Sequence, residues 1–158
     1  MVNAAFSPEP YLKGNTIVST ETPLRPQPRF PEPDTEPFWE ATKRHELAYQ
    51  SCDGCGEVIF YPRQHCTACG SQDISWQVSA GLGSVYTFSV IMQSRDPAFK
   101  DLGPYAVGYV DLDEGFRIMT NIVGVDDPIG DIKCGMRVKV VWEDQGEGEV
   151  SLPMFEPA

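Results

Sequence analysis

The chain has 158 residues, of which 41% are hydrophobic and 11% aromatic, enough to bury the core of one domain, with or without a small appended module. Its formal net charge is −11, and residues 101–158 hold 12 acidic side chains against four basic ones. Because proteins bind nucleic acids largely by neutralising phosphates, this charge argues against nucleic acid as the main ligand. No apolar run approaches the roughly 20 residues of a membrane helix, and no basic and apolar leader opens the chain, so we expect a cytoplasmic protein without membrane contact.

Residues 1–33 differ in composition from the rest of the chain. They hold seven of the 14 prolines and show no sustained hydrophobic period. Proline fixes φ and removes a backbone donor, so this stretch favours extended conformations over a packed element. We interpret it as a proline-rich arm that is flexible on its own, as a segment that orders against a partner, or as a linker from a larger chain.

Residues 34–79 are expected to form a helix followed by a metal-binding ribbon. Asp34 or Thr35 caps a helix that runs through Phe38 and Trp39 to about residue 46, with Pro37 in its first turn. Two adjacent large aromatic side chains on so short a helix need a surface that buries them. That surface is either the core of the chain itself or another subunit.

Four of the five cysteines form two Cys-x-x-Cys pairs, Cys52 with Cys55 and Cys66 with Cys69, separated by ten residues. Two thiolates at this spacing converge on one cation, and two such turns joined by a short hairpin complete a tetrahedral shell of four sulfurs. Four protein thiolates leave no open coordination position, so the metal is expected to be structural. Zinc is the expected ion, with iron as the alternative because both metals use this spacing.

Residues 80–158 show the pattern of short strands separated by turns. Runs rich in Val, Ile, Tyr and Phe alternate with Gly, Asp and Pro. Five strands in about 70 residues, the first of them long, favour a small closed barrel of the OB type. The expected strands of the barrel are 84–92, 105–112, 116–123, 138–142 and 149–152, and those of the ribbon are 47–51, 57–61 and 74–78. The fold class is therefore mainly β.

Several other polar residues are considered as site candidates and set aside. His65 is expected at the surface beside the metal site, His45 on the exposed side of the helix, and Cys134 as a free, half-buried thiol. Acidic residues cluster at 111–114 and 126–127, where they are expected to serve turns. No nucleophile elbow, P-loop or dinucleotide fingerprint is present. We therefore predict no catalytic residue and no reaction by this chain alone.

A series of motifs follows in a distinctive order: Pro-Phe-Trp-Glu (37–40), Cys-x-x-Cys-Gly (52–56), Pro-Arg (62–63), Cys-x-x-Cys-Gly (66–70), Gly-x-Gly-x-Val-Tyr-x-Phe (81–88), Pro-Tyr (104–105), Leu-x-Glu-Gly (112–115), Gly-Met-x-Val (135–138) and Leu-Pro-x-Phe-x-Pro (152–157). Together they resemble the acyl-CoA-associated family, of the domain-of-unknown-function 35 type, that joins a rubredoxin-like zinc ribbon to an OB-fold. The resemblance covers residue 34 to the C-terminus and leaves the proline-rich arm outside.

The resemblance implies a non-catalytic accessory subunit. Members of the family accompany thiolase-superfamily proteins, among them sterol-carrier-type thiolases and aldolases that cleave β-hydroxyacyl-CoA, including those of steroid side-chain degradation. The partner supplies the chemistry, while the ribbon and barrel stabilise the hetero-oligomer and shape its acyl-CoA entrance.

Carried onto this chain, the resemblance implies that the four cysteines hold zinc and that Phe38 and Trp39 dock on the partner. Arg63 is expected to meet a CoA phosphate or a partner carboxylate, or else to be an ordinary surface arginine. Three aromatic residues are expected at the barrel mouth, lining a pantetheine or acyl path or belonging to the barrel core: Tyr86, Phe88 and Tyr105.

Two other function classes compete with this expectation. Zinc ribbons and OB barrels also bind DNA or RNA, so a nucleic-acid-binding module is the alternative, against which the acidic barrel region argues. A self-sufficient thioesterase or hydratase predicts acyl-CoA turnover by the isolated chain, and no residues in the sequence support it.

Overall fold

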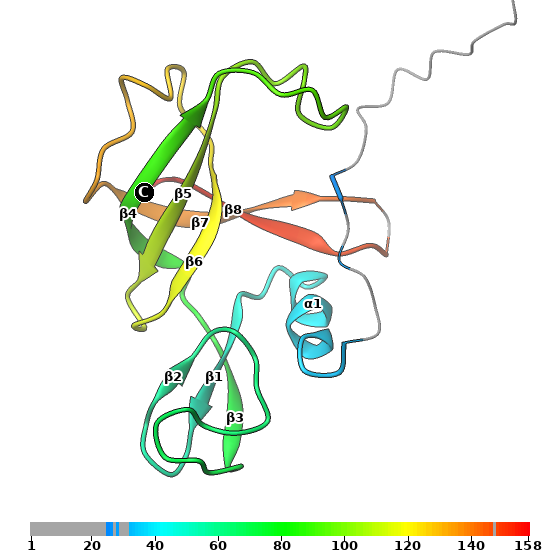
Figure 1. Cartoon of the computed structure of the whole chain (residues 1–158), viewed down its shortest axis with the longest axis vertical. Helices are drawn as coiled ribbons and strands as arrows, with labels where there is room; N and C mark the ends of the chain where they lie inside the picture. The colour runs from blue at the N-terminus through cyan, green and yellow to red at the C-terminus, as the bar shows by residue number, and fades with distance from the viewer. Residues whose placement is uncertain (1–24, 27, 29–31, 147) are drawn as a thin grey trace, which may run out of the picture.

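The computed structural model describes residues 25, 26, 28, 32–146 and 148–158. In this part of the chain a short helix precedes two separate β-sheets (Figure 1). The elements are α1 (Glu36–Thr42), β1 (Ala48–Cys52), β2 (Val58–Ile59), β3 (Ile74–Val78), β4 (Leu82–Ile91), β5 (Tyr105–Leu112), β6 (Arg117–Ile122), β7 (Arg137–Asp144) and β8 (Ser151–Pro157). No helix among these residues is long and apolar enough to cross a membrane. The expectation for an extended arm falls mostly on residues outside the described ranges.

The helix α1 is shorter than the sequence suggested, because it ends at Thr42 rather than near residue 46. His45 adopts a left-handed backbone conformation with φ of 58°, which an α-helix cannot continue. Its ring then stacks on Trp142 of β7 with a centroid distance of 5.4 Å. Its Nε2 also lies 2.7 Å from a carboxylate oxygen of Asp144. His45 is thus exposed, as expected, but it lies beyond the helix and joins its end to the barrel, which corrects the expectation of a helical residue.

The first sheet is a three-stranded antiparallel ribbon in the order β2-β1-β3. Its two Cys-x-x-Cys turns are alike. The N–H of Gly56 donates to the carbonyl of Cys52 at 2.7 Å, and the N–H of Gly70 donates to the carbonyl of Cys66 at 2.9 Å. Both glycines have a φ of 77°, which residues with a side chain rarely adopt. The backbone of each turn is therefore shaped to present two sulfurs on one side.

The second sheet closes into a five-stranded barrel in the order β4-β5-β6-β8-β7, with β7 paired to β4. All pairs are antiparallel except β6 with β8, which meet in parallel at Ile122 and Phe155. The predicted OB-type barrel is thus confirmed, including its long first strand of ten residues. The last strand runs to Pro157, further than expected, because it must reach along β7 to close the barrel.

Helix, ribbon and barrel share one hydrophobic core. Phe38 and Leu47 from the first part of the chain belong to the same buried cluster as Val110 and Phe155 from the barrel. At the junction the Phe60 ring stacks on Phe116 with a centroid distance of 4.7 Å and an interplanar angle of 9°. This continuous packing fixes the ribbon against the barrel and places α1 beside the β7–β8 hairpin (Figure 1).

Candidate metal centre and neighbouring apolar cleft

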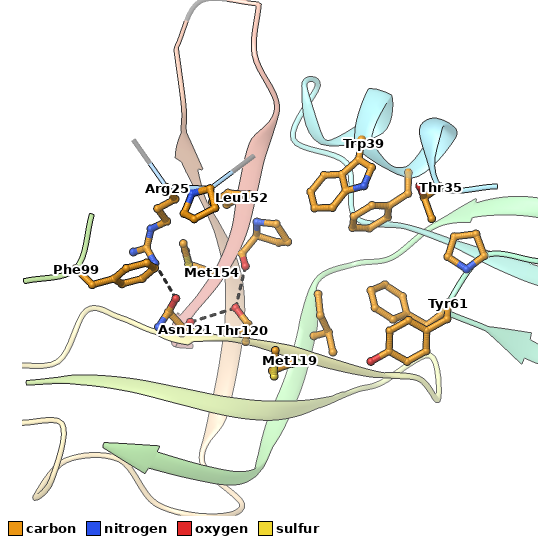
Figure 2. A pocket seen from close by; sticks show the side chains of 16 residues that line it. Arg25, Thr35, Trp39, Tyr61, Phe99, Met119, Thr120, Asn121, Leu152 and Met154 are labelled. Carbon is orange, nitrogen blue, oxygen red and sulfur yellow. Dashed lines mark hydrogen bonds between the residues drawn. The ribbon is translucent and has the colours of Figure 1, made fainter. Parts of the chain in front are cut away.

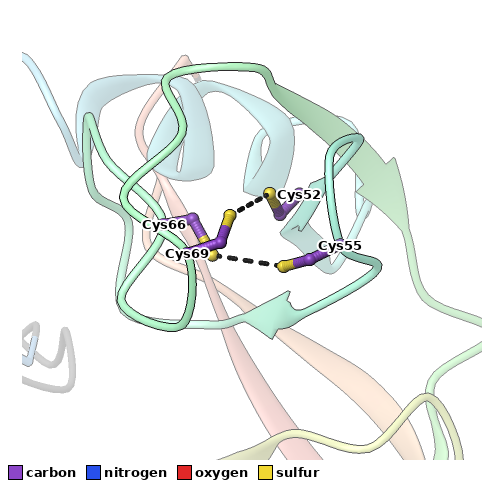
Figure 3. A group of neighbouring side chains, drawn as sticks. All are labelled: Cys52, Cys55, Cys66 and Cys69. Carbon is purple, nitrogen blue, oxygen red and sulfur yellow. Dashed lines mark hydrogen bonds between the residues drawn. The ribbon is translucent and has the colours of Figure 1, made fainter.

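The ribbon brings its four cysteine sulfurs together at the end of the sheet (Figure 3). All four lie within 4.8 Å of one another. The Sγ atoms of Cys52 and Cys69 are 3.6 Å apart, as are those of Cys55 and Cys66. Each Cys-x-x-Cys turn contributes one buried and one exposed residue. This geometry suits a tetrahedral shell around one ion.

The electrostatics of the four thiols favour a cation between them. The backbone N–H of Cys69 donates to the Cys66 sulfur and lowers the pKa of that thiol to about 7. At Cys55 the backbone N–H of Glu57 lowers the pKa, but the neighbouring thiols outweigh it and raise the value to about 12. The first thiolate to form thus opposes ionisation of the others, and a divalent cation removes that opposition.

The donor set therefore fits a structural zinc ion, as expected from the sequence. Cysteine thiolates are the preferred ligands of zinc in closed sites, and here they fill the coordination shell. His65 takes no part in this cluster, because its Nε2 lies 2.7 Å from the side-chain nitrogen of Gln72 at the exposed surface. Cys134 is exposed rather than half-buried, on the loop before β7 and outside the thiol cluster.

An apolar cleft of about 570 Å³ lies between the helix–ribbon part and the barrel. Figure 2 shows Trp39 and Tyr61 at one end of the cleft, with Arg25 and Phe99 at the other. Strands β6 and β8 form its barrel wall, where Met119 and Leu152 lie. A cavity of this size and lining is typical of sites for small organic ligands.

The structure places Phe38 and Trp39 side by side in the wall of this cleft. Their rings pack edge to face with centroids 4.9 Å apart. Phe38 is only 8% exposed and belongs to the hydrophobic core, whereas Trp39 is half-buried against it. Of the two candidate docking residues, only Trp39 therefore has an accessible surface that a partner could contact, and the Phe38 ring packs against it.

Arg63 lies in a second, polar hollow of about 740 Å³ beside the ribbon, together with His65 and Gln64. The two hollows share Tyr61 and Pro62 in their walls, so they adjoin. The backbone N–H of Arg63 donates to the buried Gln50 side chain at 2.8 Å, which fixes the main chain at this point. The exposed guanidinium makes no ion pair with the part of the chain that the structure describes.

The three barrel aromatics are not brought together at one mouth. A β-bulge between Val85 and Thr87 shifts the register of β4, so Tyr86 faces outward while Phe88 packs on the core. Tyr86 is 54% exposed and lies under the Arg117 guanidinium. Tyr105 stacks on Phe99, which itself lines the apolar cleft. Without the bulge, residues 86 and 88 would share a face, as the sequence suggested.

Two acidic residues of the cluster at 111–114 are held in ion pairs. Arg117 donates to Asp111 and Arg137 donates to Asp113, and each guanidinium lowers the pKa of its partner carboxylate. A carboxylate whose pKa is lowered is a poor proton donor near neutral pH. The two ion pairs thus give Asp111 and Asp113 a structural role at the end of the barrel where β5 and β6 are joined.

Sequence reasoning missed the residues that close the far end of the cleft. Arg25 comes from the proline-rich arm, and its guanidinium donates to Asn121 of β6 and to Glu143 of β7. Arg25 and Glu143 are separated by 118 positions in the sequence. No local period or motif marks such a pair, so only the folded chain shows it.

Two family models match the chain. The rubredoxin-like zinc ribbon domain of ChsH2 matches residues 39–75, and the C-terminal OB-fold domain of ChsH2 matches residues 76–143. Among solved structures, the Ltp2-ChsH2(DUF35) aldolase superposes with a TM-score of 0.74 at 36% identity, over 83% of this chain and 98% of that chain.

Curated relatives agree with these matches. The chain is 38% identical to a probable enoyl-CoA hydratase alpha subunit of Thermomonospora curvata, over 85% of this chain and 40% of the relative. It is 30% identical to the 3-oxo-4,17-pregnadiene-20-carboxyl-CoA hydratase alpha subunit of Mycobacterium tuberculosis, over 78% of this chain and 38% of the relative. It therefore spans well under half the length of these two proteins.

A shorter relative matches over most of its length. It is a DUF35 domain-containing scaffold protein of Methanothermobacter thermautotrophicus, 34% identical over 68% of this chain and 80% of the relative. The matches cover both the ribbon and the barrel and confirm the resemblance found in the sequence. The chain belongs to the ChsH2-type DUF35 family, in which a rubredoxin-like zinc ribbon precedes an OB-fold domain.

Proposed function

We propose that this chain is a non-catalytic accessory subunit of a thiolase-superfamily complex that acts on acyl-CoA as an aldolase or thiolase. The observation that carries the proposal is the match to the Ltp2-ChsH2(DUF35) aldolase, of which the matched chain is covered over 98% of its length. In this role the partner provides the reacting groups, and the ribbon and barrel stabilise the hetero-oligomer. The hydratase relatives, one of them acting on a steroid-derived acyl-CoA, support steroid side-chain degradation as the setting.

The two adjoining hollows support a part in the acyl-CoA entrance. The apolar cleft offers room for hydrocarbon, and the polar hollow beside it carries the Arg63 guanidinium. Acyl-CoA combines these two chemistries, an apolar acyl group and a chain of phosphates. Trp39 at the cleft wall is the proposed docking residue, with Phe38 beneath it.

The cytoplasm is the proposed compartment, since two Cys-x-x-Cys pairs that hold metal suit a reducing environment.

Nucleic-acid binding is the weaker alternative. An OB barrel that binds a nucleic acid strand needs unpaired cations beside its aromatic side chains. Here the arginine over Tyr86, Arg117, is already paired with Asp111. The net charge of −11 adds to this argument.

Co-purification tests the proposal. The chain is tagged and expressed with a thiolase-like protein from the same source, and the product is assayed for mass, zinc content and cleavage of β-hydroxyacyl-CoA. We expect a stable complex with one zinc per chain that is active only when both proteins are present. A chain that stays alone, turns over acyl-CoA by itself or retains nucleic acid would contradict the proposal.

The role of Arg63 is tested in the same complex by Arg63→Gln. We expect a higher KM for acyl-CoA, since one contact to a phosphate is lost, while the complex forms as before. Arg95→Gln is the matched control, because Arg95 is also exposed and makes no ion pair within the described ranges. Equal effects of the two variants on KM would mean that Arg63 is an ordinary surface arginine without a contact to acyl-CoA.

A further inference from the structure

Arg25 occupies a shaped site at the far end of the apolar cleft. Its Nη2 donates to Glu143 at 2.9 Å, and its Nη1 donates to the Asn121 side-chain oxygen at 2.9 Å. The guanidinium also lies 4.8 Å from the centre of the Phe99 ring. The Arg25 side chain is only 11% exposed, so this charge is largely removed from water. Figure 2 shows it reaching across the end of the cleft towards Asn121.

The groups that receive Arg25 are themselves held in place. Asn121 donates through its side-chain nitrogen to the carbonyl of Ala106 at 2.9 Å, which turns its oxygen towards the arginine. Gln145 is buried, donates to Glu143 at 3.0 Å and accepts from the backbone N–H of Arg25 at 3.2 Å. Because these partners are themselves held in place, they fix the position of the guanidinium and place a counter-ion beside its charge.

At the far end of the cleft the polar groups already have partners inside the protein. The Thr120 hydroxyl donates to the carbonyl of Pro153 at 2.8 Å, Asn121 accepts from Arg25, and Arg25 is also paired with Glu143, which lies outside the cleft lining. A bound ligand would therefore gain little by offering polar atoms to this end of the cleft. It would lose hydration free energy by bringing a charge into an apolar space.

We propose that the Arg25–Glu143 pair determines the specificity of the cleft, by keeping its far end neutral so that the cleft accepts an uncharged apolar group, such as the hydrocarbon of an acyl chain. The volume of about 570 Å³ fits a small ligand of that kind. The name of the ligand class rests on the proposed function, whereas the preference for an uncharged group rests on the cleft alone. Arg25 lines the cleft, and Glu143 acts through Arg25 by neutralising its charge.

The test uses the full zinc-loaded chain and two probes that differ only at the head group, dodecanol and dodecanoate. Each probe displaces the neutral fluorophore N-phenyl-1-naphthylamine, so its affinity is read from the loss of fluorescence. In the unchanged protein we expect dodecanol to bind at least about tenfold more tightly than dodecanoate, because the one cation in the described lining of the cleft, Arg25, is already paired with Glu143. Leu152→Trp fills the cleft and is expected to abolish fluorophore binding, which places the probe there.

Glu143→Gln leaves the charge of Arg25 in place and removes its counter-ion. Dodecanoate is then expected to bind about tenfold more tightly, as a charge-assisted hydrogen bond becomes available, with dodecanol unchanged. Arg25→Gln leaves Glu143 instead and is expected to weaken dodecanoate further. Arg44→Gln is the matched control, because Arg44 pairs with Glu46 on the exposed surface and outside the cleft.

Zinc content and circular dichroism verify that each variant is folded. Equal affinity for the two probes in the unchanged protein, or an unchanged affinity ratio in folded Glu143→Gln, would overturn the proposal. Failure of the fluorophore to bind would also overturn it and would assign the cleft to side chains of a partner protein. Because the assay needs no partner, its failure leaves the accessory-subunit proposal standing, and failed co-purification leaves this result standing.

Discussion

The ribbon and the barrel are stabilised in different ways. The separate core of the ribbon consists of Cys52, Ile59 and Cys66 with Ile74 packed beside them. The barrel buries a much larger set of side chains, of which Val110, Val138 and Phe155 are fully enclosed. A core of three residues cannot offset the conformational entropy of some 30 ordered residues, so the ribbon depends on its metal. The barrel depends on burial of apolar surface.

The junction between them complicates this contrast. Leu47 and Ala48, at the start of the ribbon, belong to the barrel's core cluster and not to that of the cysteines. The ribbon is thus anchored to the barrel at one end and closed by metal at the other. Each region can be perturbed by itself, and the difference between the responses measures how far the shared core couples them.

Loss of the metal is expected to have the largest effect. Cys52→Ser removes one of the four thiolates and, with it, most of the folding free energy of the ribbon, which for a structural zinc site is on the order of 10 kcal/mol. We expect no bound zinc and rapid amide exchange in β2 and the two Cys-x-x-Cys turns, with protection retained in β5 and β6. Metal analysis and hydrogen-exchange mass spectrometry check this.

Cys134→Ser is the control for that experiment, since Cys134 is exposed and outside the thiol cluster. It should keep one zinc per chain and a protected ribbon. If amide exchange rises equally in ribbon and barrel after Cys52→Ser, the two regions unfold as one unit and the contrast between them is wrong.

Truncation of the barrel core is expected to come second. Phe155 is fully buried in β8, where it pairs with Val140 of β7 and Ile122 of β6. Phe155→Ala should lower the free energy of unfolding by about 3–5 kcal/mol, because it removes apolar contacts and leaves a cavity. Urea denaturation followed by circular dichroism measures the loss. Ile129→Ala, at a residue that is 59% exposed, is the control and should change little.

The sequence predicts the metal site better than it predicts the cleft, for a physical reason. Cysteine spacing is a local property, so Cys52 and Cys55 identify the site before any fold is known. The barrel is also predictable, since its strands carry a local period of apolar residues. The cleft depends on contacts between distant residues, such as Arg25 with Glu143, which leave no local signal.

Local irregularities were equally hard to predict. The bulge after Val85 turns Tyr86 away from Phe88, yet nothing in the alternating pattern of β4 marks it. The early end of α1 goes with the left-handed backbone of His45 and the stacking of its ring on a barrel tryptophan, a tertiary contact that the helical pattern does not show.

A change at the junction is expected to have a moderate effect and to sharpen the comparison. Phe60→Leu keeps the residue apolar but removes the ring that stacks on Phe116 and packs against Phe38. We expect a loss of about 1 kcal/mol, since an aromatic pair contributes roughly that much beyond its buried area. The double variant Phe60→Leu/Phe116→Leu should cost less than the sum of the single variants.

Urea denaturation of the four proteins in this cycle gives the coupling free energy between the two rings. Additive effects would mean that the ribbon and the barrel do not stabilise each other through this contact. The link between ribbon and barrel would then rest on the other members of the shared cluster, such as Leu47 and Ala48.

The smallest effect is expected at the surface of the barrel, from Asp111→Asn. Arg117 donates to Asp111 and lowers the pKa of this carboxylate, so the pair stabilises the fold above the ordinary aspartate pKa. That contribution is lost as the pH falls through the lowered pKa of the folded state. The side chains are 43% and 47% exposed, so water and salt screen the pair and the loss should be smaller than for Phe60→Leu. Urea midpoints of variant and parent should differ slightly at neutral pH and converge in acid, whereas a difference that persists in acid would mean that Asp111 acts by hydrogen bonding or packing and not by charge.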